Sequence, residues 1–227
     1  MAGVVNGTSV LGLAFDKGVI VAADQLVSYG SMARFRNCDR ILKVNERTVV
    51  AASGDYADYQ FMERVISQKQ IEEEEWNDGF TLNPAALHSW LSRVAYNRRS
   101  RFEPLWCSWL VAGLQPSEDG AQTPYLGFVD KLGTSYSSNV IATGFGSYLA
   151  TPLFRELTEI NGKTRDQLPT EEEARNLVTK CMEVLYYRDA RSLPKYKIAV
   201  IKPVGVTIEG PVEFKGDWQV ASQVAGF

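Results

Sequence analysis

Segments typical of strands and segments typical of helices occur in blocks along this chain and do not alternate. Strand segments fill residues 10–52, two helical segments follow within residues 53–101, strand segments return within residues 105–140, and two more helical segments precede two final strands. A regular alternation would indicate a parallel sheet, whereas separate blocks are typical of an α+β fold. The order therefore predicts two sheets, each covered by a pair of helices.

The strands are indicated by apolar runs separated by short polar turns. Val19–Ala23 is apolar throughout, which suits a strand that is buried on both faces. The first four strands pair naturally as two hairpins, because short polar connections join them. The predicted strands at the two ends of the chain are Val10–Phe15 and Val19–Ala23, Ile41–Val44 and Thr48–Ala52, and finally Tyr196–Lys202 and Val206–Glu209.

Capping residues indicate where the four helices begin. Asn83 followed by Pro84 is typical of an N-cap and a first helical residue, and Thr170 with Glu173 forms a capping box. We expect the first helix to begin at Ser53 and to end at Asn77-Asp78-Gly79. The third helix is expected to open at Ser147, after Gly144-Phe145-Gly146.

Composition and charge exclude several classes of function. The 227 residues suffice for one domain with its own core. The net charge of −3 does not favour a nucleic-acid partner, and the apolar runs are much shorter than the roughly 20 residues that span a bilayer, so no membrane partner is expected. A glycine-rich phosphate loop is also missing from the sequence, and we expect no cofactor.

The few cysteines and the single histidine limit the available chemistry. Cys38, Cys107 and Cys181 are widely spaced and odd in number, which is typical of reduced thiols, and we expect them to be buried packing residues. A histidine-based triad or a multi-histidine metal site would have to use His88. Because His88 lies in the apolar pattern of the second helix, we expect it to be a surface or packing residue and predict no metal site.

Five separated segments of the chain belong together: Gly7–Gly12, Gly18–Asp24, Tyr29–Arg36, Ala52–Asp58 and Val184–Ser192. In this order they resemble the β-type subunits of the 20S proteasome, and the resemblance covers nearly the whole chain. The resemblance implies a four-layer αββα sandwich of the N-terminal nucleophile hydrolase type. Catalytic members use a threonine, exposed by self-cleavage, whose own α-amine accepts the proton; this amine must be free, because a peptide nitrogen has no such basicity.

The resemblance also implies where the family's site would lie in this chain. It places the nucleophile on Thr8, which follows Gly7 as in cleavable members. The remaining positions that keep the family's residue type are Asp24 (the orienting aspartate), Gly54 (the oxyanion-hole glycine, whose N–H would meet developing negative charge), and Asp189 and Ser192 (the late aspartate and serine).

Two positions depart from the family's pattern. The lysine that keeps the threonine reactive is replaced by Arg40, whose planar guanidinium cannot share a proton. The serine beside the threonine amine is replaced by Phe145, which offers no hydroxyl. We therefore expect a non-catalytic subunit with a vestigial site. The alternative is an active threonine-type endopeptidase, released by cleavage between Gly7 and Thr8.

The resemblance further implies the organisation and the partners of the chain. Residues 1–7 would be a short N-terminal extension, residues 8–209 the β-type domain and residues 210–227 a C-terminal interaction tail. The expected partners are the other α and β subunits in a stacked four-ring assembly in cytoplasm and nucleus, with the tail reaching the opposite β ring. The apolar residues expected to make that contact are Trp218, Val220, Val224 and Phe227.

Overall fold

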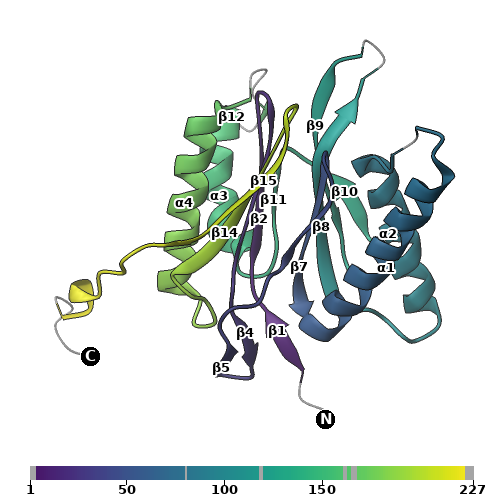
Figure 1. Ribbon diagram of the computed structural model, residues 1–227. Coiled ribbons are helices and arrows are strands. Elements are labelled where there is room, and N and C mark those ends of the chain that lie inside the picture. Colours follow the sequence, from purple (N-terminus) through teal and green to yellow (C-terminus); the bar gives the residue numbers. More distant parts are fainter. Residues whose placement is uncertain (1–3, 80, 118–119, 161–162, 165–167, 223–227) are drawn as a thin grey trace.

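Two antiparallel sheets stack face to face, and a pair of helices covers the outer face of each (Figure 1). This computed structural model describes residues 1–227 except 1–3, 80, 118–119, 161–162, 165–167 and 223–227. Three apolar clusters fill the spaces between the layers. One lies under the first helix pair, one between the two sheets and one under the second helix pair. The predicted two-sheet sandwich is confirmed.

The larger sheet has the strand order β10-β9-β8-β7-β1-β4-β5, and β6 also pairs with β7. Helices α1 (Tyr56–Trp76) and α2 (Pro84–Ser100) pack on its outer face. Its strands are β1 (Val5–Gly7), β4 (Val27–Tyr29), β5 (Met32–Phe35), β6 (Ile41–Asn45), β7 (Thr48–Asp55), β8 (Cys107–Pro116), β9 (Gln122–Val129) and β10 (Ser135–Ser137).

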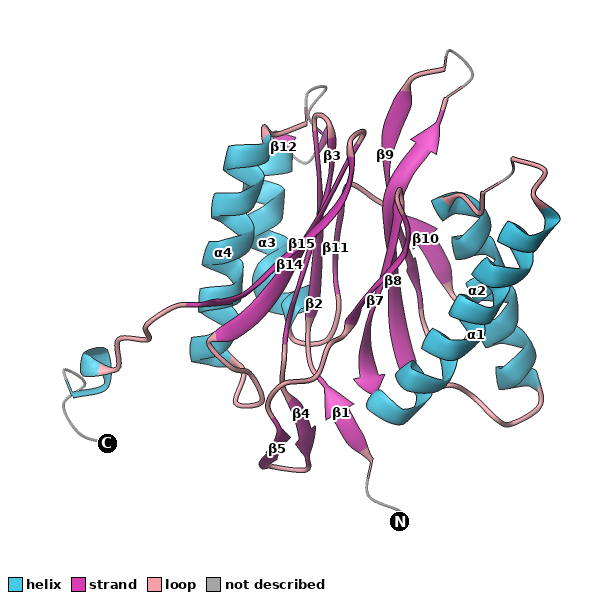
Figure 2. Cartoon of the chain, in the orientation of Figure 1, coloured by secondary structure: helices cyan, strands magenta, loops and turns pink. Residues whose placement is uncertain are grey.

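The smaller sheet has the order β11-β2-β3-β14-β15 and is covered by helices α3 (Gly146–Thr158) and α4 (Glu171–Arg188) (Figure 2). A separate two-stranded sheet, β12 (Glu159–Ile160) with β13 (Lys163–Thr164), follows α3, and a short 3-10 helix lies at Gln219–Ser222. The five strands are β2 (Val10–Phe15), β3 (Gly18–Asp24), β11 (Val140–Ala142), β14 (Lys195–Lys202) and β15 (Gly205–Glu213).

Burial explains the apolar run of β3. This strand lies between β2 and β14 in the middle of its sheet, with α4 on one face and the larger sheet on the other. All seven of its residues are buried. Ile20 and Ala22 face the helices, while Val19, Val21 and Ala23 face the other sheet. Both hairpins predicted at the N-terminal end of the chain are confirmed.

Two of the four helix starts are as predicted. Asn83 and Thr170 cap α2 and α4, and the capping box of Thr170 and Glu173 is present. The prediction that Ser53 caps α1 is wrong, because Ser53 lies within β7, where it pairs with Ser108, and Asp55 is the N-cap. Helix α3 begins at Gly146, one residue before the predicted Ser147.

The last strand is longer than predicted. It continues past Glu209 to Glu213, and Val212 pairs with Tyr196 of β14. Phe214 then packs against the apolar cluster under α3 and α4. Residues 210–213 therefore belong to the sheet, so the predicted strand end at Glu209 is wrong, and a free tail would start only after Phe214.

The single histidine and two of the three cysteines have the packing roles that were predicted. The His88 ring is buried, with Nδ1 2.7 Å from the Tyr125 hydroxyl and Nε2 2.8 Å from the Phe128 carbonyl oxygen. Cys107 and Cys181 are buried, but Cys38 is only partly buried, so the prediction of a packing role is wrong for Cys38.

Candidate functional site

The first strand of the larger sheet leads directly into the candidate site. Val5–Gly7 forms β1, which lies between β4 and β7, with Gly7 opposite both Val27 and Gly54. Thr8 follows at the point where the chain passes from the larger sheet into β2 of the smaller one. The nitrogen of Thr8 is therefore part of a peptide bond with a strand that is paired on both sides.

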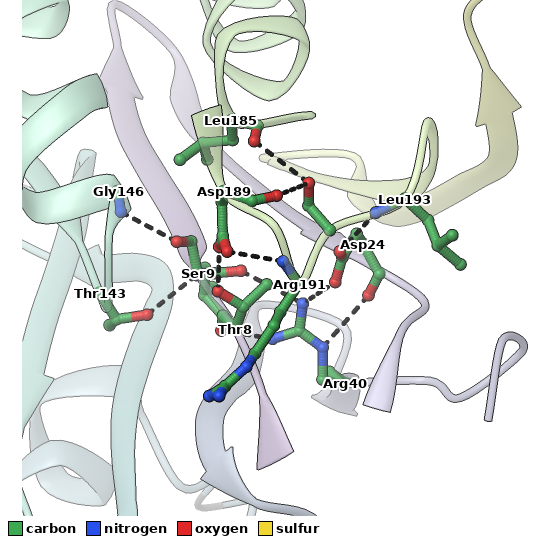
Figure 3. Close-up of polar contacts among 12 residues, drawn as sticks. Thr8, Ser9, Asp24, Arg40, Thr143, Gly146, Leu185, Asp189, Arg191 and Leu193 are labelled. Atoms are coloured by element: carbon green, nitrogen blue, oxygen red, sulfur yellow. Dashed lines mark hydrogen bonds and ion pairs between the residues drawn. The ribbon is translucent and has the colours of Figure 1, made fainter. Parts of the chain in front are cut away.

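The structure brings Thr8 and Asp189 together, although they are 181 positions apart in the sequence. The Thr8 hydroxyl donates a hydrogen bond to the Asp189 carboxylate (Figure 3). Asp189 caps the C-terminal end of α4 and is buried, and its other carboxylate oxygen accepts a hydrogen bond from the Arg191 N–H at 2.9 Å. The hydroxyl of Ser192 donates to the carbonyl oxygens of Leu185 (3.1 Å) and Asp189 (2.7 Å).

Arg40 lies beneath Thr8 and is almost completely buried, with 2 % of its surface exposed. Its guanidinium makes an ion pair with Asp24 at the end of β3. It also donates to four backbone carbonyl oxygens, those of Thr8 (2.8 Å), Ser9 (3.2 Å), Asp24 (3.2 Å) and Ala52 (3.2 Å). A guanidinium has five N–H groups, so these contacts use its full donor capacity.

Asp24 is held from two sides. One carboxylate oxygen pairs with Arg40, and the other accepts a hydrogen bond from the Leu193 N–H at 3.1 Å. Burial raises the pKa of the Asp24 carboxyl, while the Arg40 guanidinium opposes this rise. A buried carboxylate is stable when it is paired and hydrogen-bonded in this way, so the pair forms a link between the N-terminal strands and the loop after α4.

Two glycines allow the backbone to approach closely at the site. A Cβ atom on Gly7 would lie 2.5 Å from Cδ of Arg40, so only glycine leaves room for the arginine there. Gly54 has φ +103, and a Cβ atom would lie 2.2 Å from the Trp106 carbonyl oxygen. Both positions therefore need glycine for reasons of packing and backbone conformation.

A pocket of about 440 Å³ lies beside Thr8. Gly54, Phe145 and Asp189 are among the predicted site residues that line it, whereas Asp24, Arg40 and Ser192 are not. Phe145 is exposed. The hydroxyl of Ser9, the residue after Thr8, accepts a hydrogen bond from the Gly146 N–H at 2.9 Å.

Sequence reasoning missed parts of this site. It assigned no strand to Val5–Gly7, and it did not place Trp106 and Lys131 at the pocket, where the Lys131 ammonium lies 4.1 Å from the centre of the Trp106 ring. The apolar character of Trp106 was visible, but no pattern in the sequence joined it to residues 6–8. Among the described residues, no three His, Cys, Asp or Glu side chains gather as a metal site would require. None of the described helices has the length and hydropathy needed to cross a membrane.

Comparison with known proteins accounts for this architecture. Residues 4–201 match the family "Proteasome subunit". The chain is 53 % identical to the proteasome subunit beta type-4 of Xenopus laevis, covering 98 % of this chain and 88 % of that protein. It is 41 % identical to the probable proteasome subunit beta type-7 of Schizosaccharomyces pombe, over 99 % of this chain and 83 % of that protein. It is 35 % identical to the proteasome subunit beta type-4 of Arabidopsis thaliana, over 96 % of this chain and 84 % of that protein. The four-layer sandwich, the site at the start of β2 and these matches together show that the chain belongs to the proteasome subunit family.

Proposed function

We propose that this chain is a non-catalytic β subunit of the 20S proteasome core, and that it contributes to protein degradation by building the particle. Its family membership and the names of its relatives, proteasome subunits beta type-4 and type-7, support a place in that assembly. The state of the Thr8 site supports the absence of peptidase activity. Three features of the site oppose catalysis: the contacts of Arg40, the strand before Thr8, and Phe145.

The observation that carries the proposal is the hydrogen bonding of Arg40. A reactive threonine in this family needs a compact ammonium group beside its hydroxyl, as the resemblance implies. Here all five guanidinium N–H groups are directed to Asp24 and to backbone carbonyl oxygens. None remains for the Thr8 hydroxyl, which donates to Asp189 instead. An arginine also keeps its charge at all accessible pH values and cannot exchange a proton with the nucleophile.

The N-terminal strand gives a second argument. Catalysis would require a free amine on Thr8, but Gly7 acylates this nitrogen and is paired with both Val27 and Gly54. Strand β1 also fills the position between β4 and β7 that an extended peptide could otherwise occupy. The chain's own backbone thus takes this sheet position, while the pocket of about 440 Å³ lies beside Thr8. Phe145, which offers no hydroxyl near Thr8, is the third argument.

Labelling with a threonine-directed electrophile tests this proposal. We expect that an epoxyketone inhibitor, added in excess to the intact core particle, leaves Thr8 unmodified, because adduct formation needs both the hydroxyl and the free amine. The catalytic β subunits of the same particle serve as positive controls. A covalent adduct on Thr8, found by peptide mass spectrometry, would contradict the proposal.

An active threonine peptidase is the second candidate. The proximity of Thr8 and Asp189, with Gly7 in front of the threonine and Gly54 opposite Gly7, favours it. Intact mass of the subunit from native particles separates the two candidates. A chain that begins at Thr8 and reacts with the electrophile would support the peptidase, whereas a chain that retains residues before Thr8 would support the structural role.

We further propose partners and a cellular location. The chain would assemble with other α and β subunits in cytoplasm and nucleus, and the segment after Phe214 would contact the opposite β ring. Trp218 supports this role for the tail: it is 52 % exposed, and its indole N–H donates to the Tyr186 hydroxyl at 3.2 Å, so it is held at the surface beside α4. Val220 lies in the short 3-10 helix, and Val224 and Phe227 lie outside the described residues.

A further inference from the structure

The C-terminal end of α2 is closed by a phenylalanine in the left-handed conformation. Phe102 has φ +61, its N–H donates to the Arg99 carbonyl oxygen at 3.1 Å, and the N–H of Glu103 donates to the Arg98 carbonyl oxygen at 3.0 Å. These two bonds define a Schellman motif in which Phe102 occupies the position that usually holds glycine. An aromatic L-residue is disfavoured there, because its Cβ atom lies too close to the following carbonyl oxygen.

Packing within the chain does not compensate for this conformation. Phe102 is 94 % exposed, more than any other large apolar side chain described. An exposed ring contributes no burial to the stability of the subunit, and glycine would relax the backbone. The structure of the single chain therefore gives no reason for a phenylalanine at this position, and this points to a contact outside the chain.

The surroundings of Phe102 are strongly basic. Residues 93–101 contain four arginines and no acidic residue, in a chain whose net charge is −3. Arg98 pairs with Glu103 and lies over the Phe61 ring. Arg99 lies over the exposed Tyr96 ring and Arg101 is exposed, and in the described part of the chain neither has a carboxylate partner.

We propose that Tyr96, Arg99, Arg101 and Phe102, here named the Phe102 patch, form a docking surface for a neighbouring subunit of the core particle. The partner surface would present an apolar pocket for the Phe102 ring, bordered by carboxylates that pair with Arg99 and Arg101. Aromatic and arginine side chains are the residues that most often dominate protein interfaces, and charge complementarity orients the partner. This inference rests on the proposed function, because it takes the partner from the same particle.

Substitution of Phe102 by glycine separates a docking role from a structural one. Glycine adopts φ +61 without strain, so we expect Phe102→Gly to melt at the same temperature as the wild-type chain or higher. When tagged wild-type and variant chains are expressed together, we expect about tenfold less of the variant in purified core particles, as for the loss of an interface hot spot. The matched control is Val204→Ala, since Val204 is 91 % exposed on the turn between β14 and β15; this variant should assemble like wild type.

A photo-crosslinking amino acid at position 102 identifies the partner. With benzoylphenylalanine there, illumination of the purified particle should join this chain to one other subunit, near an Asp or Glu residue, and Arg101→Glu should reduce both the crosslink and incorporation. Phe102→Gly assembling as well as wild type, an equal loss in Val204→Ala, or no crosslink in an assembled particle would each overturn the docking proposal. Failure of the wild-type chain to co-purify with proteasome subunits would instead contradict the proposed function, and the docking proposal with it.

Discussion

Arg40 has a structural role in this protein, that of a clamp between the two sheets. It joins backbone carbonyl oxygens of β7 and of the segment between β1 and β2 to the carboxylate at the end of β3, so a single side chain links the two sheets. Gly7 makes room for it. Arg40 stands at the position where the resemblance places a catalytic lysine. Its hydrogen bonds go to Asp24 and to backbone carbonyl oxygens of this chain.

We expect substitutions of Arg40 to destabilise the chain without creating activity. Arg40→Met would leave Asp24 buried without a counter-charge and lower the free energy of unfolding by about 3–5 kcal/mol. Arg40→Lys keeps the charge but offers three donors for five acceptors, so we expect a loss of about 1–3 kcal/mol. Neither variant should hydrolyse fluorogenic peptides, because the Thr8 nitrogen remains acylated.

Urea unfolding of the purified subunit measures these losses. Arg47→Met is the control, since Arg47 is exposed on the turn between β6 and β7 and its removal should change stability by no more than about 0.5 kcal/mol. An Arg40→Met variant as stable as this control would show that the contacts of Arg40 contribute nothing to the free energy of unfolding.

At the scale of elements, the sequence predicted the helix starts that depend only on neighbouring residues. The starts of α2 and α4 follow from Asn83 with Pro84 and from the capping box at Thr170, because a cap needs only neighbours in sequence. Ser53 has a side chain that could cap a helix, but its backbone pairs with Ser108, and this distant partner decides its conformation.

Strand β1 and the candidate site illustrate the limit of such signals. Three residues are too few to show a strand period, and the partners of β1 lie at residues 27–29 and 54–55. Likewise, no local pattern connects Thr8 with Asp189; only the resemblance brought the site residues together, and the fold places them in contact. The left-handed conformation of Phe102 was also unpredictable, because the residue that normally indicates such a helix end in a sequence is glycine.

An ion pair between elements gives a prediction about pH. Glu209 of β15 accepts two hydrogen bonds from Arg175 of α4, at 2.7 and 2.8 Å, and these hold the pKa of Glu209 below its usual value. A carboxyl with a lower pKa in the folded state stabilises the fold above its unfolded pKa of about 4.3, and loses that contribution as the pH falls through the folded value.

Glu209→Gln should therefore flatten the decrease in stability between neutral and acidic pH. We expect a difference of at most about 1 kcal/mol at neutral pH, because the pair is partly exposed and screened by solvent. Thermal unfolding from pH 7 to pH 3 measures this, with Glu213→Gln as a control that removes the same charge from the same strand. Parallel curves for Glu209→Gln and wild type would contradict the assignment.

At the scale of the whole molecule, the C-terminal segment extends away from the layered body (Figure 2). Among the described residues of this segment, Phe214 is the last that packs on the main apolar clusters, and the aromatic contacts of Trp218 are with the rings of Tyr186 and Tyr187. Truncation after Glu209 would remove part of β15, so it cannot separate folding from assembly. A cut after Lys215 leaves β15 and Phe214 intact.

We expect the chain truncated after Lys215 to fold and to enter half-particles that join slowly or weakly. Burial of the Trp218 ring in a partner would contribute roughly 1.5–3 kcal/mol, which the truncated chain forgoes. Native gels would then show half-particles accumulating beside reduced amounts of full core particle. Normal amounts of full particle, without half-particles, would rule out this role for the tail.

The position of β1 has a consequence for the continuity of the larger sheet. Strands β4 and β5 are joined to β7 only through Val5–Gly7 in the described strand order. Cutting the chain after Gly7 and releasing this segment would divide one eight-stranded sheet into a five-stranded part and a separate hairpin of β4 and β5, with an open slot between them. The peptide bond before Thr8 therefore also keeps the larger sheet continuous. While it is intact, the segment that acylates the threonine nitrogen is the same one that connects β4 and β5 to β7.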